Sequence, residues 1–542
     1  MHKKVLSPQN ILLLLVAVTL ACSGSKKTIT APAPSVLEFS RTITAEGLRT
    51  DLSVLAHDSL RGRRTGDIGL DMAANYLAKR YASIGLEAVG DDGTYFQHFD
   101  LNRPITNGYE YRVYDSEGEL VDESSHNATS LGNFRTWRAG EPDLQGEIVF
   151  AGYGIKNETI DQYPEDGAGK WFMVFYDRAN FTTMQQQVAE KGALGIILIM
   201  STEDSYFATQ ATNMQSGFGN PGGFSLKYLE SEAELPSAIH MIKPSFAGTL
   251  LGLDSTDELA ALSEDITSAP ENFSASATGY EFGYDHDQEK NIVGSKNVVA
   301  FIEGTDPELK DEVVVLSSHY DHVGIGQPDS TGDALYNGAD DDGSGTVGLL
   351  HVAQALVSAK KSGAELKRSV LILHVSAEEE GLLGSRYYSD HPIYDIENTV
   401  ANLNVDMIGR RDPEFGDNGN YVYIIGGKII SSGLNDMLVE ANLESVNLEL
   451  SDRYNDLNDP NQFYRRSDHW NFGRLGVPFI FFFNGTHADY HRPSDEIDKI
   501  DFDALTKRSK LLFYTTAKVA NAEARPEVDN QTFIERTQQQ PR

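Results

Sequence analysis

Residues 313–321 read VVVLSSHYD, an apolar run of the length of a buried strand that ends in a histidine and an acid. Similar apolar runs return downstream at 370–380 (VLILHVSAEEE), 400–406 (VANLNVD) and 478–483 (PFIFFF), and the first two of these also end in acids. Segments with helical spacing of apolar residues alternate with them, at 344–359, 382–389, 432–441 and 502–523. This alternation predicts an α/β fold with a mixed, mostly parallel central sheet that helices cover on both faces.

Five side chains that can bind metal lie after these predicted strands or in polar loops beside them: His319, Asp341, Glu379, Asp406 and His491. Because parallel strands end at one edge of a sheet, we expect these side chains to meet there. Two imidazoles and three carboxylates suit a pair of zinc ions that share one bridging carboxylate. Each segment alone also has an ordinary explanation, such as an acidic helix start at 338–345, and only their combination predicts a metallohydrolase.

Three neighbouring side chains fit supporting roles in such a site. Asp321 follows His319 by two residues and can accept the proton on its second ring nitrogen. Glu378 precedes Glu379 and can act as a general base on a metal-bound water. Tyr490 precedes His491 and can donate a hydrogen bond to an oxyanion.

Together these segments resemble the M28 family of zinc peptidases, over about residues 300–500 and, more loosely, at 60–63 (LRGR) and the helix after it. The resemblance implies that His319 and Asp406 bind one zinc ion, that Glu379 and His491 bind the other, and that Asp341 bridges them. It makes Glu378 the general base, Asp321 the partner of His319 and Tyr490 the oxyanion donor. The segment 467–469 (SDH) also resembles a family segment, which we interpret as structural or substrate-side.

The activity implied by the resemblance is a two-zinc exopeptidase that removes N-terminal residues from peptides. A carboxypeptidase of the same family is an alternative, because the residues that set specificity are not recognisable. A glutaminyl cyclase with a related fold is a second alternative, although it uses one zinc ion and does not need the full set of ligands. A third is a binding module that keeps the fold without catalysis, which the intact ligands and Glu378 disfavour.

Composition limits the remaining choices. The chain of 542 residues is too long for one ordinary domain, and 40% hydrophobic residues allow a substantial core. Its formal net charge of -35 repels phosphate backbones, so we expect no nucleic-acid partner. The oligomeric state cannot be predicted.

The N-terminus predicts export. Lys3 and Lys4 precede a short apolar run at 11–21, which leads to Cys22, the single cysteine of the chain. This resembles a bacterial lipoprotein signal, with Cys22 as the lipidated first residue of a periplasmic or cell-surface protein. An ordinary cleaved signal peptide is the alternative. A single cysteine also excludes an intramolecular disulfide.

Shifts in composition predict six segments. A short stretch at 191–197 (KGALGII), after a strand and a helix, resembles the protease-associated domain inserted in several zinc exopeptidases. The expected segments are a signal peptide (1–22), a linker (23–42), an N-terminal part of the peptidase domain (43–125), a β-rich protease-associated insert (126–285), the catalytic domain (286–525) and a polar tail (526–542).

Overall fold

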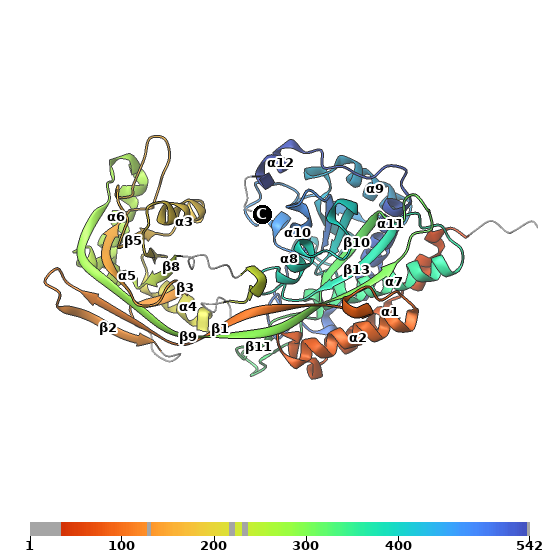
Figure 1. Ribbon diagram of the computed structural model, residues 1–542, viewed down its shortest axis with the longest axis horizontal. Helices are drawn as coiled ribbons and strands as arrows, with labels where there is room; N and C mark the ends of the chain where they lie inside the picture. Colours follow the sequence, from red (N-terminus) through yellow and green to blue (C-terminus); the bar gives the residue numbers. More distant parts are fainter. Residues whose placement is uncertain (1–33, 127–131, 216–222, 230–236, 539–542) are drawn as a thin grey trace, which may run out of the picture.

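The protein is described from a computed structural model, which covers residues 34–126, 132–215, 223–229 and 237–538. Two lobes lie side by side, joined by a long two-stranded ribbon that runs along both of them (Figure 1). The ribbon consists of β1 (Phe96–Tyr114) and β9 (Ser276–Ile302), which pair antiparallel from Phe96 with Val298 to Tyr114 with Glu281. The two lobes therefore share one continuous sheet.

The lobe that contains the predicted catalytic domain, named the catalytic lobe for this reason, is built on the half of this sheet that continues from β9. Its strands follow in the spatial order β13 (Ser369–Val375), β10 (Val313–His319), β14 (Thr399–Val405), β17 (Phe479–Phe483), β15 (Tyr421–Gly426) and β16 (Glu449–Ser451). The first four are mutually parallel, whereas β9 and β15 join them antiparallel. This confirms the predicted mixed, mostly parallel sheet and puts the carboxyl ends of four neighbouring strands at one edge.

Helices cover both faces of this sheet, because the side chains of each strand alternate between two apolar layers. Val314 and Leu316 of β10 face one layer, with α1 (Ala45–Leu55), α2 (Ile68–Ile84), α7 (Gly345–Lys361), α9 (Ser432–Leu443) and α11 (Phe502–Asn521). Val313 and Val315 face the other, with α8 (Leu383–Asp390) and α10 (His469–Gly473). Every residue of β10 is buried, which explains why its sequence is a continuous apolar run.

The second lobe carries its own core on the other half of the sheet. Its strands follow β9 in the order β4 (Leu144–Phe150), β5 (Lys170–Phe175), β6 (Gly195–Ile199), β8 (Ala238–Ile242) and β3 (Phe134–Arg138), and β2 (Leu120–His126) pairs with β1. Four helices complete it: α3 (Phe181–Glu190), α4 (Asp204–Gln215), α5 (Pro244–Leu250) and α6 (Thr256–Ser268). Short strands β7 (Ser225–Leu226), β11 (Gly324–Ile325) and β12 (Leu335–Tyr336) lie outside this core.

Three of the expected segment boundaries differ from the structure. Tyr109, Tyr111 and Val113 pack in the core of the second lobe, so this lobe begins within β1 and not at residue 126. The expected linker already contains a short helix, η1 (Val36–Thr42), which is attached to α11 by a 3.0 Å hydrogen bond between the hydroxyls of Ser40 and Tyr514.

The expected polar tail also contains a helix, α12 (Gln531–Gln538). It forms because Phe533, 1% exposed, packs against Phe479 of β17. The predicted signal peptide and Cys22 lie outside the described residues. Among the residues that are described, none of the helices is both long enough and apolar enough to cross a membrane.

Candidate metal centre

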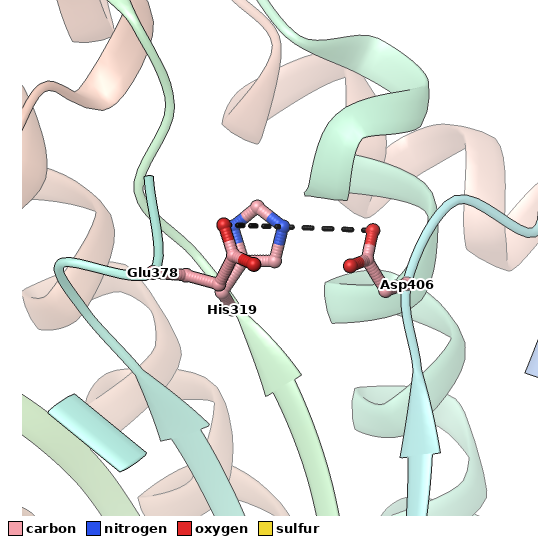
Figure 2. Close-up of side chains that lie close together, drawn as sticks. All are labelled: His319, Glu378 and Asp406. Carbon is pink, nitrogen blue, oxygen red and sulfur yellow. Dashed lines mark ion pairs between the residues drawn. The ribbon is translucent and has the colours of Figure 1, made fainter. Parts of the chain in front are cut away.

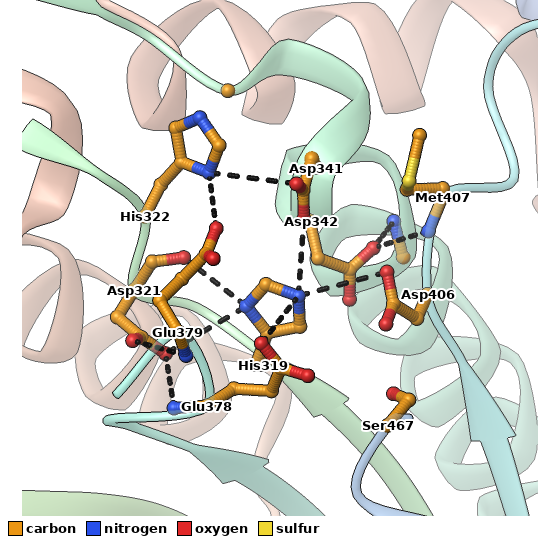
Figure 3. Close-up of polar contacts among 12 residues, drawn as sticks. His319, Asp321, His322, Asp341, Asp342, Glu378, Glu379, Asp406, Met407 and Ser467 are labelled. Atoms are coloured by element: carbon orange, nitrogen blue, oxygen red, sulfur yellow. Dashed lines mark hydrogen bonds and ion pairs between the residues drawn. The ribbon is translucent and has the colours of Figure 1, made fainter. Parts of the chain in front are cut away.

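The carboxyl ends of β10, β13 and β14 bring most of the candidate residues together (Figure 3). His319 is the last residue of β10, Glu378 and Glu379 follow β13, and Asp406 follows β14. Asp341 comes from the turn η6 (Ala339–Ser344) that precedes α7. His491 comes from the loop after β17. All five predicted ligands therefore meet at the sheet edge, in two adjoining groups.

The first group surrounds the Nε2 atom of His319 (Figure 2). Its Nε2 lies 3.2 Å from Asp341 Oδ1, 3.6 Å from Asp406 Oδ1 and 4.0 Å from Glu378 Oε2. The second group surrounds His491, whose Nε2 lies 3.0 Å from Asp341 Oδ2 and 3.1 Å from Glu379 Oε2. Each oxygen of the Asp341 carboxylate thus faces a different imidazole, which is the geometry of a bridging ligand.

These separations fit metal ligands. Donor atoms about 2.0–2.2 Å from a tetrahedral zinc ion lie roughly 3.3 Å from one another. The separations of 3.0–3.6 Å around His319 and His491 lie close to that value. His319 Nε2 and Asp341 Oδ2 are also buried without a hydrogen bond of good geometry within the described residues. The donor set therefore fits two adjacent cations.

The three adjacent acids of η6 have different contacts. Asp340 Oδ1 accepts hydrogen bonds from the main chain of Gly409 (2.7 Å) and the hydroxyl of Ser344 (2.8 Å). Asp342 Oδ1 accepts hydrogen bonds from the main chain of Gly345 (2.9 Å) and Met407 (3.0 Å). Both fix the turn against the segment after β14, so Asp341 is the acid that presents its two oxygens to the imidazoles.

His322 also belongs to the centre, although our sequence analysis did not identify it. Its Nδ1 lies 2.8 Å from Glu379 Oε1 and 3.8 Å from Asp341 Oδ2, and its side chain is fully buried. It contacts the Glu379 oxygen that does not face His491, so Glu379 is held between two histidines. The signal was present in the sequence, since His322 follows His319 by three residues.

Asp321 lies beside His319, as predicted, and contacts it through both its carbonyl and its carboxylate. The acceptor closest to His319 Nδ1 is the main-chain carbonyl oxygen of Asp321, at 3.2 Å, and the carboxylate lies farther away, at 3.6 Å. The carboxylate accepts hydrogen bonds from the main-chain N–H groups of Glu378 (3.2 Å) and Glu379 (3.4 Å) and from the Thr65 hydroxyl (3.2 Å). Asp321 therefore orients the ring of His319 through its carbonyl and the two glutamates through its side chain.

Two further residues hold the acidic turn. Arg63, from the segment 60–63, is buried, and its guanidinium donates to the carbonyl oxygens of Leu55, Tyr320, Asn337 and Gly338 at 2.7–3.0 Å. Asp495 Oδ2 accepts from the main-chain N–H groups of Asp340 (3.0 Å) and Asp341 (3.1 Å). Both contacts fix the backbone that presents Asp341.

The charges of the centre shift its ionisable groups. Burial disfavours the charged imidazole of His491, but Glu379 and Asp341 outweigh it and raise its pKa to about 10. Burial likewise opposes protonation of His319, yet Glu378 and Asp406 hold its pKa well above the usual value. Burial raises the pKa of Glu378 well above its usual value, and the nearby carboxylate of Asp406 adds to this. The carboxylates therefore stabilise the protonated, positively charged forms of His319 and His491.

A pocket opens beside the two groups. Asp341, Glu378, Asp406 and His491 form its polar wall, and its apolar wall consists of Met407, Phe463, Phe481, Phe483 and Tyr490. The ring of Tyr490 stacks on His491 with centroids 4.0 Å apart, and burial, with Asp341 and Glu379 nearby, raises its pKa far above the usual value. Tyr490 therefore keeps its hydroxyl proton and can donate it in a hydrogen bond.

The segment 467–469 lies behind this pocket. Ser467 Oγ accepts a 3.0 Å hydrogen bond from Asn404 of β14, Asp468 is fully buried, and the His469 ring packs against Phe481. Among the described residues, none of the three belongs to the two sets whose donor atoms lie within 4.8 Å of one another, which are His319 with Glu378 and Asp406, and His322 with Asp341 and Glu379.

Residues 297–516 match the sequence model of Peptidase family M28. The chain is 28% identical over 247 residues to "Leucine aminopeptidase 2" of Arthroderma otae, a match that covers 42% of this chain and 45% of that relative. It is 26% identical over 280 residues to "Probable leucine aminopeptidase" of Arthroderma benhamiae, covering 48% of this chain and 73% of that one. The chain thus matches less than half the length of the first of these relatives.

The fold is also similar to a solved structure, "Aminopeptidase from Aneurinibacillus sp. strain AM-1". The TM-score is 0.57 over 91% of this chain and 97% of the other, at 17% sequence identity. This similarity supports the fold, and the matched sequence model supports the family. Residues 297–516, less than half of the chain, thus match peptidase family M28.

Proposed function

We propose that this chain is a two-zinc aminopeptidase that removes N-terminal residues from peptides. The observation that carries the proposal is the Asp341 carboxylate, whose two oxygens lie 3.2 Å from His319 and 3.0 Å from His491. The names of the relatives, which are leucine aminopeptidases, support the choice of an aminopeptidase over a carboxypeptidase.

In this proposal His319 and Asp406 hold one zinc ion, His491 and Glu379 hold the other, and Asp341 serves both. When bound, the two ions would supply Lewis acidity to the peptide carbonyl and acidity to a water molecule. His322 would donate its Nδ1 proton to Glu379 Oε1, 2.8 Å away, and leave Oε2 free for the metal.

Glu378 lies beside this centre without being needed as a ligand, with Oε2 4.0 Å from His319 Nε2. We assign to it the transfer of a proton from the attacking water to the leaving amine. The hydroxyl of Tyr490 would donate a hydrogen bond to the oxygen of the tetrahedral intermediate. The apolar wall of the pocket would take the side chain of the first residue of the peptide.

The test combines metal content with activity on unblocked and N-blocked peptides. We expect two zinc ions per chain, release of free amino acids from unblocked peptides only, and loss of activity with a chelator. One zinc ion per chain would favour a glutaminyl cyclase, cleavage of N-blocked peptides would favour a carboxypeptidase, and cleavage that survives the chelator would refute the mechanism.

We also propose that the chain is exported and anchored by lipid at Cys22, and that the second lobe is a protease-associated domain. The first proposal is supported by the basic residues and the apolar run before Cys22. Labelling of cells with a radioactive fatty acid tests it, since a Cys22→Ser variant should lose the label.

The proposal that the second lobe is a protease-associated domain is supported by the segment 191–197 and by its place between two parts of the catalytic lobe. Deletion of this lobe should leave hydrolysis of an amino acid p-nitroanilide but reduce that of longer peptides; equal loss of both would contradict an access role.

A further inference from the structure

Arg466 is an exposed cation at the pocket of the proposed metal centre. Its guanidinium carbon lies 4.9 Å from the ring centroid of Phe463, which lines the same pocket. In the part of the chain that the structure describes, no carboxylate lies within ion-pairing distance of it. Arg410 and Arg474, by contrast, pair with Asp489 and Asp390 at 2.7 Å. A guanidinium in this place can therefore bind an anion from outside the protein.

The backbone that carries Arg466 is held firmly against the sheet. The next residue, Ser467, is 1% exposed and accepts the hydrogen bond from Asn404, two residues before Asp406. On the other side, Phe463 and Tyr464 are buried in the apolar core beneath the pocket. These contacts fix the Cα position of Arg466 at the pocket, and stacking on Phe463 directs its side chain along the wall.

The charge of the pocket favours an anion at this position. If the proposed function holds, two zinc ions cancel the four carboxylates of Asp341, Glu378, Glu379 and Asp406. Arg466 then adds a positive charge that no carboxylate of the described residues pairs with. The planar guanidinium fork matches a carboxylate with two parallel hydrogen bonds, which a lysine cannot reproduce.

A peptide offers this carboxylate in two places, as an acidic first side chain or as a free C-terminus. The pocket wall of Met407, Phe463, Phe481 and Phe483 suits an apolar first side chain, which disfavours the acidic one. In a dipeptide the C-terminal carboxylate lies one residue, roughly 3.5 Å, beyond the scissile nitrogen. Resting on the proposed function, we propose that Arg466 binds the free C-terminal carboxylate of dipeptide-length substrates with an apolar first residue.

The test measures binding without turnover. The parent protein is the zinc-loaded Glu378→Ala variant, and calorimetry compares its affinity for leucylglycine with that for leucylglycinamide. We expect the free acid to bind roughly tenfold more tightly, as a charge-assisted hydrogen bond at an exposed site allows. Arg466→Met in this parent should bring the ratio close to one, and Arg466→Lys should leave an intermediate ratio.

Arg465→Met is the matched control, because Arg465 is the exposed neighbouring arginine, hydrogen-bonds Gln462 and does not line the pocket. It should leave the ratio unchanged. Equal binding of acid and amide by the parent, a preference that survives in Arg466→Met, or no binding of either ligand would overturn the inference. So would an Arg466 dependence found only with glutamylglycinamide, whose carboxylate is on the first side chain.

This outcome is separable from that of the proposed function. If the zinc-loaded native protein hydrolyses no peptide, the proposed function fails, while the binding ratio of the Glu378→Ala variants can still be measured. If peptides are hydrolysed and the ratio does not depend on Arg466, the proposed function stands and the carboxylate site is refuted.

Discussion

Zinc binding should release protons from the two histidines of the centre. Glu379 and Asp341 raise the pKa of His491 to about 10, and the pKa of His319 also lies well above its usual value. At pH 7 the His491 imidazole is therefore protonated, and the raised pKa of His319 also favours its protonated form, whereas zinc needs the unprotonated nitrogen. For His491 the pH lies about three units below the pKa, so the proton competes with zinc by about a thousandfold, or about 4 kcal/mol.

The direction of the pH dependence follows from the raised pKa values. An imidazole whose pKa is raised keeps its proton, and its ion pairs with the carboxylates, until the pH rises through that raised value. Zinc therefore binds more weakly as the pH falls, and each affinity should change about tenfold per pH unit between pH 6 and 8 when one proton is displaced per ion.

Calorimetric zinc titrations in buffers of different ionisation enthalpy measure the number of protons released. We expect about two protons for two zinc ions at pH 7. The His491→Asn variant should release one proton fewer and bind one ion weakly. A zinc affinity that does not vary with pH, or titrations without proton release, would refute the reasoning, because the imidazoles would then be unprotonated before the metal arrives.

Four further substitutions test the centre and its support. Glu378→Ala should lower kcat about 10²–10⁴-fold while the zinc content measured by mass spectrometry stays at the native value, and native activity would remove Glu378 as the base. His322→Ala should weaken one zinc ion about 10–100-fold in chelator competition, and His322→Asn, which keeps a donor near Nδ1, should restore most of this affinity. Arg63→Met should lower the free energy of unfolding in urea by about 3–5 kcal/mol, because four buried carbonyls lose their donor; a change within error would contradict that role. Phe533→Ala should cost about 3–5 kcal/mol in the same assay if α12 is part of the core, whereas an unordered tail predicts no change.

The fold could be predicted from the sequence because its strands are buried on both sides. Val313, Val314, Val315 and Leu316 are all needed to fill two apolar layers, so the strand appears as a run of apolar residues with polar groups only at its end. The mixed sheet and the family predicted from these runs are confirmed by the structure and by the matched sequence model. The boundaries were less accurate, because β1 passes through both lobes and no change in composition marks the crossing.

The short helices at the two ends of the described chain were missed for a different reason. Both η1 and α12 are attached by tertiary contacts to distant parts of the chain. In η1, Val36 packs in the core and Ser40 is hydrogen-bonded to Tyr514. In α12, Phe533 packs against Phe479 and Arg536 donates to the carbonyl oxygen of Leu457. A contact between residues that are far apart in the sequence leaves no periodic pattern in it. Local pattern analysis therefore assigns such segments to linkers and tails.

Local sequence also predicts only part of the metal centre. A strand end followed by an acid predicts that a side chain lies at the sheet edge, and this placed His319, Glu379 and Asp406 near one another. It does not predict which oxygen of a carboxylate faces which partner. Asp321 accepts hydrogen bonds from the main-chain N–H groups of Glu378 and Glu379, and His322 Nδ1 lies 2.8 Å from Glu379 Oε1, the oxygen that does not face His491. Both contacts depend on the course of loops across the sheet edge. We infer that the strands determine where the two cations would bind, and that these loop residues determine how tightly.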